Sequence, residues 1–256
     1  MARVRRLVAI FLVFLVILAL SACGGSKQPG GLSGATGRTI AAKTASFSLA
    51  ISGTIGSMKV QSSETGSVSF AERLAHFYKL VPGGGMPQEI VLDGPYAYTN
   101  ANVDAALKDS SVKPWTKLDT RRVPVAQQRA HPDELSHVRV VAYLADGVAH
   151  ASKIGTDDIA GETQVHFRGV VDPAQVVAAA PAAERAALRT AIGNDYLAKA
   201  FPADFWVDAA GRLRRVLVGY RMSGGGQVVV DGRFSDFGVK VDLTVPAASE
   251  IQDITP

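Results

Sequence analysis

Residues 44–55 read TASFSLAISGTI, and the apolar residues Phe47, Leu49, Ile51 and Ile55 alternate there with small or polar ones. Successive side chains of a β-strand point to opposite faces, so a period of two is typical of a strand with one buried face. The stretch therefore predicts a half-buried strand, and the chain that follows repeats its period.

Further strands of this kind are predicted downstream, separated by turns rich in glycine and proline. Gly66 is expected to form one of these turns. The strands are expected at 58–64, 67–71, 76–81, 89–92, 96–99, 148–154, 163–171, 204–208, 213–222, 227–234 and 240–245. Neighbouring strands are joined mostly by short turns, which favours one antiparallel sheet of about ten strands.

Two segments have helical periodicity instead, 132–145 and 174–192. In the first, Leu135, Val138 and Val141 fall on one face, and the second should break at Pro181. Helices grouped in two blocks predict an α+β fold rather than alternating βαβ units. A twisted sheet of this size curls into a half-barrel, and we expect the two helical segments to cover its concave face.

The N-terminus carries an apolar run, Leu7 to Leu20, preceded by three arginines. Fourteen helical residues span about 21 Å, short of the roughly 30 Å hydrocarbon core of a bilayer. A basic segment followed by such a run is typical of a secretory signal. Ser21 and Ala22 come directly before Cys23, which resembles a bacterial lipobox. An ordinary signal with a chance cysteine, or a short membrane anchor, is the alternative.

The lipobox predicts three regions of the chain. Residues 1–22 are a signal peptide, residues 23–39 are a lipidated flexible tether rich in Gly and Ser, and residues 40–256 form a single domain. Cys23 would carry the lipid, holding the protein at the outer face of the cell membrane. It is the only cysteine of the chain, so we expect no disulfide in the domain, which at this length can rely on its own core.

The formal charge of +4 is misleading as an indication of nucleic-acid binding. Three of the 27 basic residues, Arg3, Arg5 and Arg6, belong to the signal, and 24 basic residues then face 23 acidic ones. A nearly neutral domain gives no reason to expect a polyanion as partner.

Motifs for bond chemistry are missing from the sequence. The five histidines show no spacing for a shared metal, and no Gly-x-Ser-x-Gly sequence is present. Arg212, Arg214, Arg215 and Arg221 could face anionic headgroups, but an exposed strand face is the commoner explanation. We therefore expect no catalytic residue, no metal and no cofactor, and the sequence favours a binding function.

An apolar ligand would need a cavity between sheet and helices. The residues expected to line it, which would equally suit a filled core, are Phe47, Leu49, Ile51, Leu135, Val138, Val141, Val176 and Val177.

Several stretches of the chain resemble the actinobacterial LprG/LppX-type lipoproteins. They are GTDDIAGET at 155–163 with FRGVVD at 167–172, FWVDAAGRL at 205–213, and FSDFG at 234–238 with Val245 and Pro246. This resemblance implies a LolA/LolB-like half-barrel with helices in its mouth and a hydrophobic cavity for acylated lipids or lipoglycans that are moved through the envelope.

The sequence thus predicts a non-enzymatic lipid carrier. Its expected partners are an acylated lipid or glycolipid, the membrane through its anchor and, further, an export transporter, but no nucleic acid. Two alternatives stay open: a structural or scaffolding lipoprotein with a filled core that acts through a protein partner, and a hydrolase with an unrecognised site.

Overall fold

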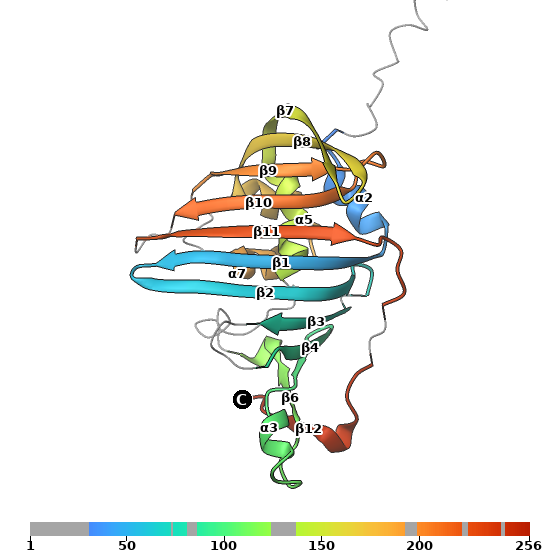
Figure 1. Ribbon diagram of the computed structural model, residues 1–256, viewed down its shortest axis with the longest axis vertical. Helices are drawn as coiled ribbons and strands as arrows, with labels where there is room; N and C mark the ends of the chain where they lie inside the picture. Colours follow the sequence, from blue (N-terminus) through green and yellow to red (C-terminus); the bar gives the residue numbers. More distant parts are fainter. Residues whose placement is uncertain are drawn as a thin grey trace, which may run out of the picture.

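One open sheet dominates the computed structural model, which describes residues 31–72, 74–80, 86–123, 137–192, 199–221, 225–241 and 244–256. Within these residues the sheet has twelve strands in the order β12-β6-β5-β4-β3-β2-β1-β11-β10-β9-β8-β7. Every pairing is antiparallel except β12 with β6. The predicted α+β class with a curled antiparallel half-barrel is confirmed, with twelve strands rather than about ten (Figure 1).

The strands occupy most of the described chain. Their bounds are β1 Thr44–Ile55, β2 Met58–Ser69, β3 Leu74–Leu80, β4 Gln88–Asp93, β5 Tyr96–Thr99, β6 Trp115–Asp119, β7 Val148–Ile159, β8 Glu162–Val171, β9 Phe201–Val207, β10 Leu213–Arg221, β11 Gln227–Ser235 and β12 Ile251–Asp253.

Strand β1 is the strand that joins the two halves of the sheet. It pairs with β2 on one side and with β11 on the other. Its alternation sets the two faces: Phe47 and Leu49 are buried, whereas Ser46 and Ser48 are only partly buried on the opposite face. We call the face that carries Phe47 and Leu49 the inner face.

The helices cover the inner face. They are α2 Ala35–Ala41, α5 His137–Tyr143, α6 Pro173–Ala179 and α7 Arg185–Ile192, with α3 Val103–Ala106 at the far edge and short 3-10 turns η1 Thr120–Arg122, η2 Leu144–Gly147 and η3 Ala248–Glu250. In Figure 1, α5 and α7 lie behind the sheet and α2 lies at one end of it.

Local sequence explains where α6 begins and ends. The carboxylate of Asp172 accepts a hydrogen bond from the Ala174 amide at 2.9 Å, and Pro173 takes the first helical position. The predicted interruption at Pro181 is confirmed, since α6 ends at Ala179 and α7 begins at Arg185. The other predicted helical segment is observed from His137 onward, and residues 132–136 lie outside the described residues.

Gly66 does not form the predicted turn. It lies inside the continuous strand β2, opposite Phe47 of β1 and Phe77 of β3. A Cβ atom at this position would collide with the His76 carbonyl and with Phe77. The glycine lets the neighbouring strands approach closely. In the sequence, such a glycine cannot be distinguished from one that forms a turn.

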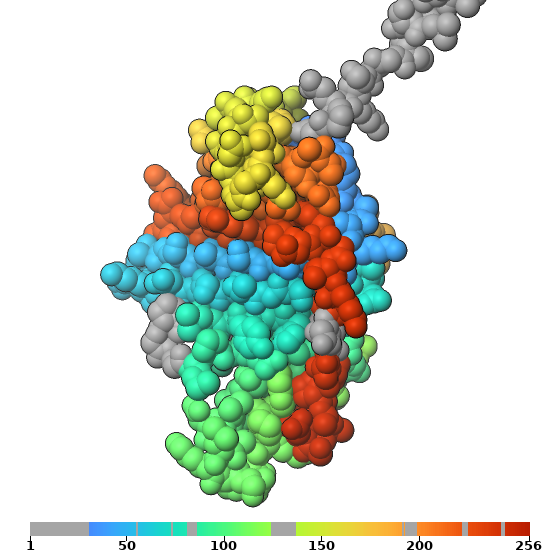
Figure 2. All heavy atoms as spheres, turned by 45° about the vertical axis from the view of Figure 1, so that its right-hand side comes forward, coloured from blue at the N-terminus to red at the C-terminus, as the bar shows by residue number. Residues whose placement is uncertain are grey.

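The predicted last strand at 240–245 is wrong for the residues that are described there, which form no strand. The last strand is β12, which pairs in parallel with β6. Figure 2 shows the C-terminal segment, in red, running along one side of the molecule toward the strands β5 and β6.

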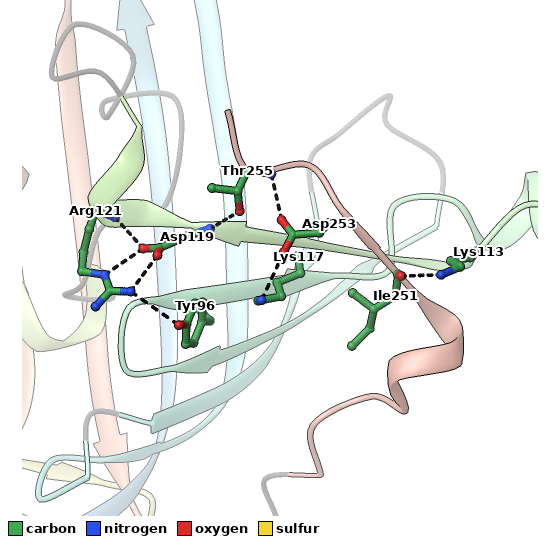
Figure 3. Close-up of polar contacts among 8 residues, drawn as sticks. All are labelled: Tyr96, Lys113, Lys117, Asp119, Arg121, Ile251, Asp253 and Thr255. Carbon is green, nitrogen blue, oxygen red and sulfur yellow. Dashed lines mark hydrogen bonds and ion pairs between the residues drawn. The ribbon is translucent and has the colours of Figure 1, made fainter.

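Side-chain contacts hold this C-terminal strand in place (Figure 3). Lys117 pairs with Asp253 at 3.2 Å, and Lys113 donates to the Ile251 carbonyl at 2.9 Å. The hydroxyl of Thr255 accepts from the Asp119 amide at 3.0 Å. The edge of the sheet is therefore covered by the end of the chain itself.

The predicted tether is too long at its C-terminal side. Helix α2 is ordered, and Leu32, Ala35 and Thr39 are buried. Thr36 donates to the Ala142 carbonyl at 2.9 Å, and the Thr39 hydroxyl accepts from the Leu213 amide at 2.8 Å. Residues 31–39 thus belong to the domain, while residues 23–30 lie outside the described residues.

Candidate functional site

An apolar pocket of about 230 Å³ lies between the inner face of the sheet and helices α5 and α7. The side chains around it come from four adjacent strands and from the helical layer. They are Leu49, Ile51, His137, Val140, Val141, Leu144, Ile192, Phe201, Val218, Tyr220 and Val230.

The register of the strands explains why a cavity forms at this level. Ile51 of β1 lies opposite Val230 of β11, which lies opposite Val218 of β10, so three branched aliphatic side chains form one row. Four residues before Ile51 on β1, Phe47 lies opposite Phe234. The aromatic row fills the space beneath the helices, whereas the shorter aliphatic row leaves room.

Gly232 sets how closely helix α5 approaches the sheet. It lies opposite Leu49, and a Cβ atom there would be 2.7 Å from Val141 Cγ1. Such a contact is shorter than real Cβ atoms allow. The glycine therefore lets Val141 rest on the sheet and fixes the depth of the pocket.

The pocket has a buried side and a partly exposed side. Leu49 and Val218 are 1% and 2% exposed, whereas the next inner-face residues along the same strands, Ile51 and Tyr220, are only partly buried. Phe201, at the start of β9, is also partly buried. The pocket thus opens toward the ends of the strands where β1 and β10 finish and β9 begins.

One buried carboxylate lies beside this apolar lining. Glu64 of β2 is opposite Leu49 in the register and only 3% exposed. Its Oε1 is 3.3 Å from His137 Nδ1 and 3.7 Å from Lys79 Nζ. Burial disfavours the charged carboxylate, but the hydrogen bond and charge of His137, with those of Lys79, outweigh it and lower the pKa of Glu64.

Three predicted lining residues, Leu49, Ile51 and Val141, border the pocket. Four others are buried in the core and do not border it, namely Phe47, Val138, Val176 and Val177. Leu135 lies outside the described residues, as does Cys23.

Sequence reasoning missed eight of the lining residues. For Val218 and Val230 the strand alternation is visible in the sequence, and for His137 and Leu144 the helical spacing to Val141 is. Which of these meet is decided by strand register, which the sequence pattern did not supply.

Three arginines of the predicted cluster, Arg212 just before β10 and Arg214 and Arg215 within it, are paired with carboxylates. Arg212 pairs with Asp208, Arg214 with Glu162 and Arg215 with Asp231, each within 2.8 Å. These ion pairs neutralise the three cations, and the side chains are only 32%, 13% and 24% exposed, so the three residues form neither a free cationic surface nor the exposed strand face that was expected.

Among the described histidines, three lie beside carboxylates: His76 at Glu89, His137 at Glu64 and His166 at Asp204. Within the described part of the chain, no three His, Cys, Asp or Glu side chains gather as a metal site. No helix in that part is long and apolar enough to cross a membrane.

Comparison with solved structures identifies the fold. Lipoprotein LppX from Mycobacterium tuberculosis superposes with a TM-score of 0.50 over 83% of this chain and 98% of that one, at 13% identity. LprF from Mycobacterium bovis, also 13% identical, gives a TM-score of 0.49 over 85% of this chain and 95% of that one.

A LolA superfamily protein from Nitrosomonas europaea gives a TM-score of 0.32 at 11% identity over 80% of this chain and 92% of that one. No protein-family model and no curated protein matches the sequence. The resemblance drawn from residues 155–172 and 205–213 is thus confirmed at the level of the fold, which the chain shares with LppX.

Proposed function

We propose that the chain is a membrane-anchored lipoprotein that binds the acyl chains of a lipid or lipoglycan in this pocket and helps to move them through the cell envelope. The observation that carries the proposal is the partly open apolar pocket between sheet and helices. The fold shared with LppX, itself a lipoprotein, supports it.

The energetic need for such a pocket is large. Exposing an acyl chain of about sixteen carbons to water costs on the order of 12 kcal/mol, at about 0.8 kcal/mol per methylene. A carrier lowers that cost by offering apolar walls, which the branched aliphatic row and helix α5 provide. Moving a lipid through the envelope in this way breaks and forms no covalent bond.

The volume of the pocket limits what it holds in this conformation. At about 230 Å³ it is smaller than the roughly 300–1,000 Å³ of most small-molecule sites. We propose that the pocket in this conformation admits part of one acyl chain. A full acyl chain is accommodated when α5 and α7 move away from the sheet. The headgroup would stay at the partly exposed side, near His137 and Tyr220.

The anchor is the second part of the proposal. Acylation of Cys23, after removal of residues 1–22, would hold the carrier at the outer face of the membrane. Replacing Cys23 by Ala should abolish membrane retention and the incorporation of radiolabelled lipid. Persistence of both would contradict the anchor.

Cargo binding is tested on residues 24–256, which retain α2 but lack the acylation site. Native mass spectrometry and organic extraction of the purified protein should reveal co-purified acylated lipid. Val218→Phe, which fills the pocket, should remove that lipid. Leu217→Phe, on the other face of the same strand, should retain it.

An apo mass that does not change on incubation with envelope lipids would contradict the carrier. It would favour the alternative, a scaffolding lipoprotein with a filled core that acts through a protein partner. A hydrolase would instead turn over an ester substrate panel, and alanine replacement of its serine or histidine would abolish the turnover.

A further inference from the structure

The pocket opens toward one end of the sheet, and the N-terminal segment is attached at the other end. We call the end where β1 and β10 finish and β9 begins the loop end, and the end where β1 starts and β9 passes into β10 the anchor end. In Figure 1, α2 lies at the anchor end, and the strand arrows of β1 and β10 point away from it.

Arg38 fixes the start of the described chain to the anchor end. Its guanidinium donates to the Gly31 carbonyl at 2.7 Å, to the Ser33 carbonyl at 3.0 Å and to the Gly211 carbonyl at 2.8 Å. Gly211 belongs to the turn between β9 and β10. Gly31 is therefore held beside that turn.

Helix α2 reinforces this attachment. Ala35 and Thr39 are fully buried, and the Thr39 hydroxyl accepts from the Leu213 amide at the start of β10. The N-terminal segment cannot shift along the sheet without breaking these contacts. Any membrane anchor upstream of Gly31 must pull on the anchor end.

The pocket residues become more exposed with increasing distance from the anchor end. Leu49 and Val218 are buried, while Ile51 and Tyr220, nearer the loop end, are partly exposed. Toward the anchor end the inner face is filled, because Phe47, Phe70 and Phe234 pack there, with the rings of Phe70 and Phe234 6.1 Å apart. A ligand therefore enters from the loop end.

The covalent reach of the tether is shorter than the sheet. Gly31 lies eight positions after Cys23, and a fully extended chain of eight steps spans at most about 29 Å. The twelve residues of β1 run about 37 Å from the anchor end to the loop end. The tether cannot fold back far enough to turn the loop end toward the bilayer.

From this geometry we infer that the pocket opens away from the membrane in which the protein is anchored. The inference rests on the proposed acylation of Cys23. Its consequence is that cargo is exchanged with an acceptor or donor on the far side of the protein, rather than directly with the leaflet that holds the anchor.

Fluorescence energy transfer from the protein to the bilayer tests this orientation. Once Cys23 is acylated the chain has no other thiol, so a single introduced cysteine carries the donor dye. Met58→Cys, where Met58 is 61% exposed, labels the loop end, and Ala209→Cys labels an exposed position at the anchor end. The full-length acylated proteins are reconstituted in vesicles that contain a headgroup-labelled acceptor.

Transfer from position 209 should exceed transfer from position 58 by roughly twofold or more, given that about 37 Å separates the two ends. Inserting twenty Gly and Ser residues between Gly30 and Gly31 should reduce this difference, because the tether then reaches up to roughly 100 Å. Equal or stronger transfer from position 58 with the native tether would overturn the inference.

Mass spectrometry of the same samples distinguishes a failure of the proposed anchor from a failure of the inferred orientation. A chain without the acyl mass contradicts the proposed anchor, and the orientation with it. An acylated chain whose position 58 lies nearer the bilayer contradicts the orientation alone, and the lipid content of the pocket, measured on residues 24–256, is unaffected by either result.

Discussion

Glu64 is a buried carboxylate in contact with His137 of the pocket lining, and its protonation should be coupled to stability. Its folded pKa lies below the ordinary value of 4.5, so the carboxylate stabilises the fold above the unfolded pKa and this contribution is lost as pH falls through the folded pKa. His137 and Lys79 supply the partner charges.

We therefore expect the free energy of unfolding of the wild type to fall as pH is lowered from 6 to about 3, and to fall less for Glu64→Gln. Urea denaturation at each pH provides the measurement. Glu72→Gln, at an exposed position, should follow the wild type. An identical pH dependence of Glu64→Gln and wild type would contradict the coupling.

Arg139 is a second buried charge, within the helical layer. It is 3% exposed, and its Nη2 donates to Glu184 at 2.7 Å, while the Tyr143 hydroxyl donates to the same carboxylate at 2.9 Å. Burial raises the pKa of Tyr143 to about 12, and the hydrogen bond and charge of Glu184 contribute to the same shift. Among the described residues, Nε and Nη1 of Arg139 have no hydrogen-bond partner.

Removing one partner of this pair should be costly, since an uncompensated buried charge remains. We expect Glu184→Leu to lower the free energy of unfolding by about 3–5 kcal/mol. The double variant Arg139→Met with Glu184→Leu should recover most of the loss, because an apolar pair of similar size avoids the unpaired charge. Urea unfolding of both variants decides, and a double variant no more stable than Glu184→Leu alone would contradict this account.

Strand β12 illustrates, at the scale of an element, how a short strand can cover a sheet edge. Asp253 has a pKa of about 2, first because the hydroxyl and amide of Thr255 donate to it and then because Lys117 does. The strand is mostly exposed and only three residues long, so its polar contacts hold it in place.

Truncation after Glu250 should therefore release the edge at β6. The amide of Asp119, which donates to Thr255, should exchange its hydrogen faster, together with the neighbouring amides of β6. Hydrogen exchange followed by mass spectrometry measures this, with β1 as the internal control. Unchanged exchange in β6 would mean that the C-terminal strand does not protect it.

The same element shows what sequence patterns can and cannot predict. The alternation of β1, β10 and β11 is strong because one face of each is buried, and these strands were predicted within a few residues. Trp115–Asp119 has no clear alternation, and its parallel partner lies more than a hundred residues away, so neither β6 nor β12 was predicted. Contacts between distant segments decide such strands.

Helix α2 was missed for a related reason. Its sequence ATGRTIA carries few apolar residues and follows a Gly- and Ser-rich stretch, so local propensity favours a tether. The burial of Ala35 and Thr39 against the rest of the domain overrides that preference. Pocket residues follow the same rule, because Val218 and Val230 border the pocket through register with Ile51.

For the whole molecule, the inner face divides into a filled part and a hollow part. Phe234, opposite Phe47, is 2% exposed and packs in the filled part, whereas Val230 on the same strand borders the pocket. The first part should provide stability and the second should determine how much cargo fits.

Phe234→Ala should thus lower the free energy of unfolding by about 3–5 kcal/mol. Val230→Ala should cost less, because its side chain already borders a void, and should increase the amount of co-purified lipid. Urea unfolding and organic extraction of both variants give the two readouts. Equal destabilisation by the two changes would contradict the division of the inner face.

The central position of β1 also governs the order in which the protein can fold. Phe47 and Phe234 are paired across the sheet although they lie 187 positions apart in the chain. A chain that emerges N-terminus first can form the hairpin of β1 and β2 early, but the other edge of β1 must wait for β11. Such distant pairing slows folding and leaves a strand edge open to other chains meanwhile. The half-barrel is therefore completed only after nearly the entire polypeptide has appeared.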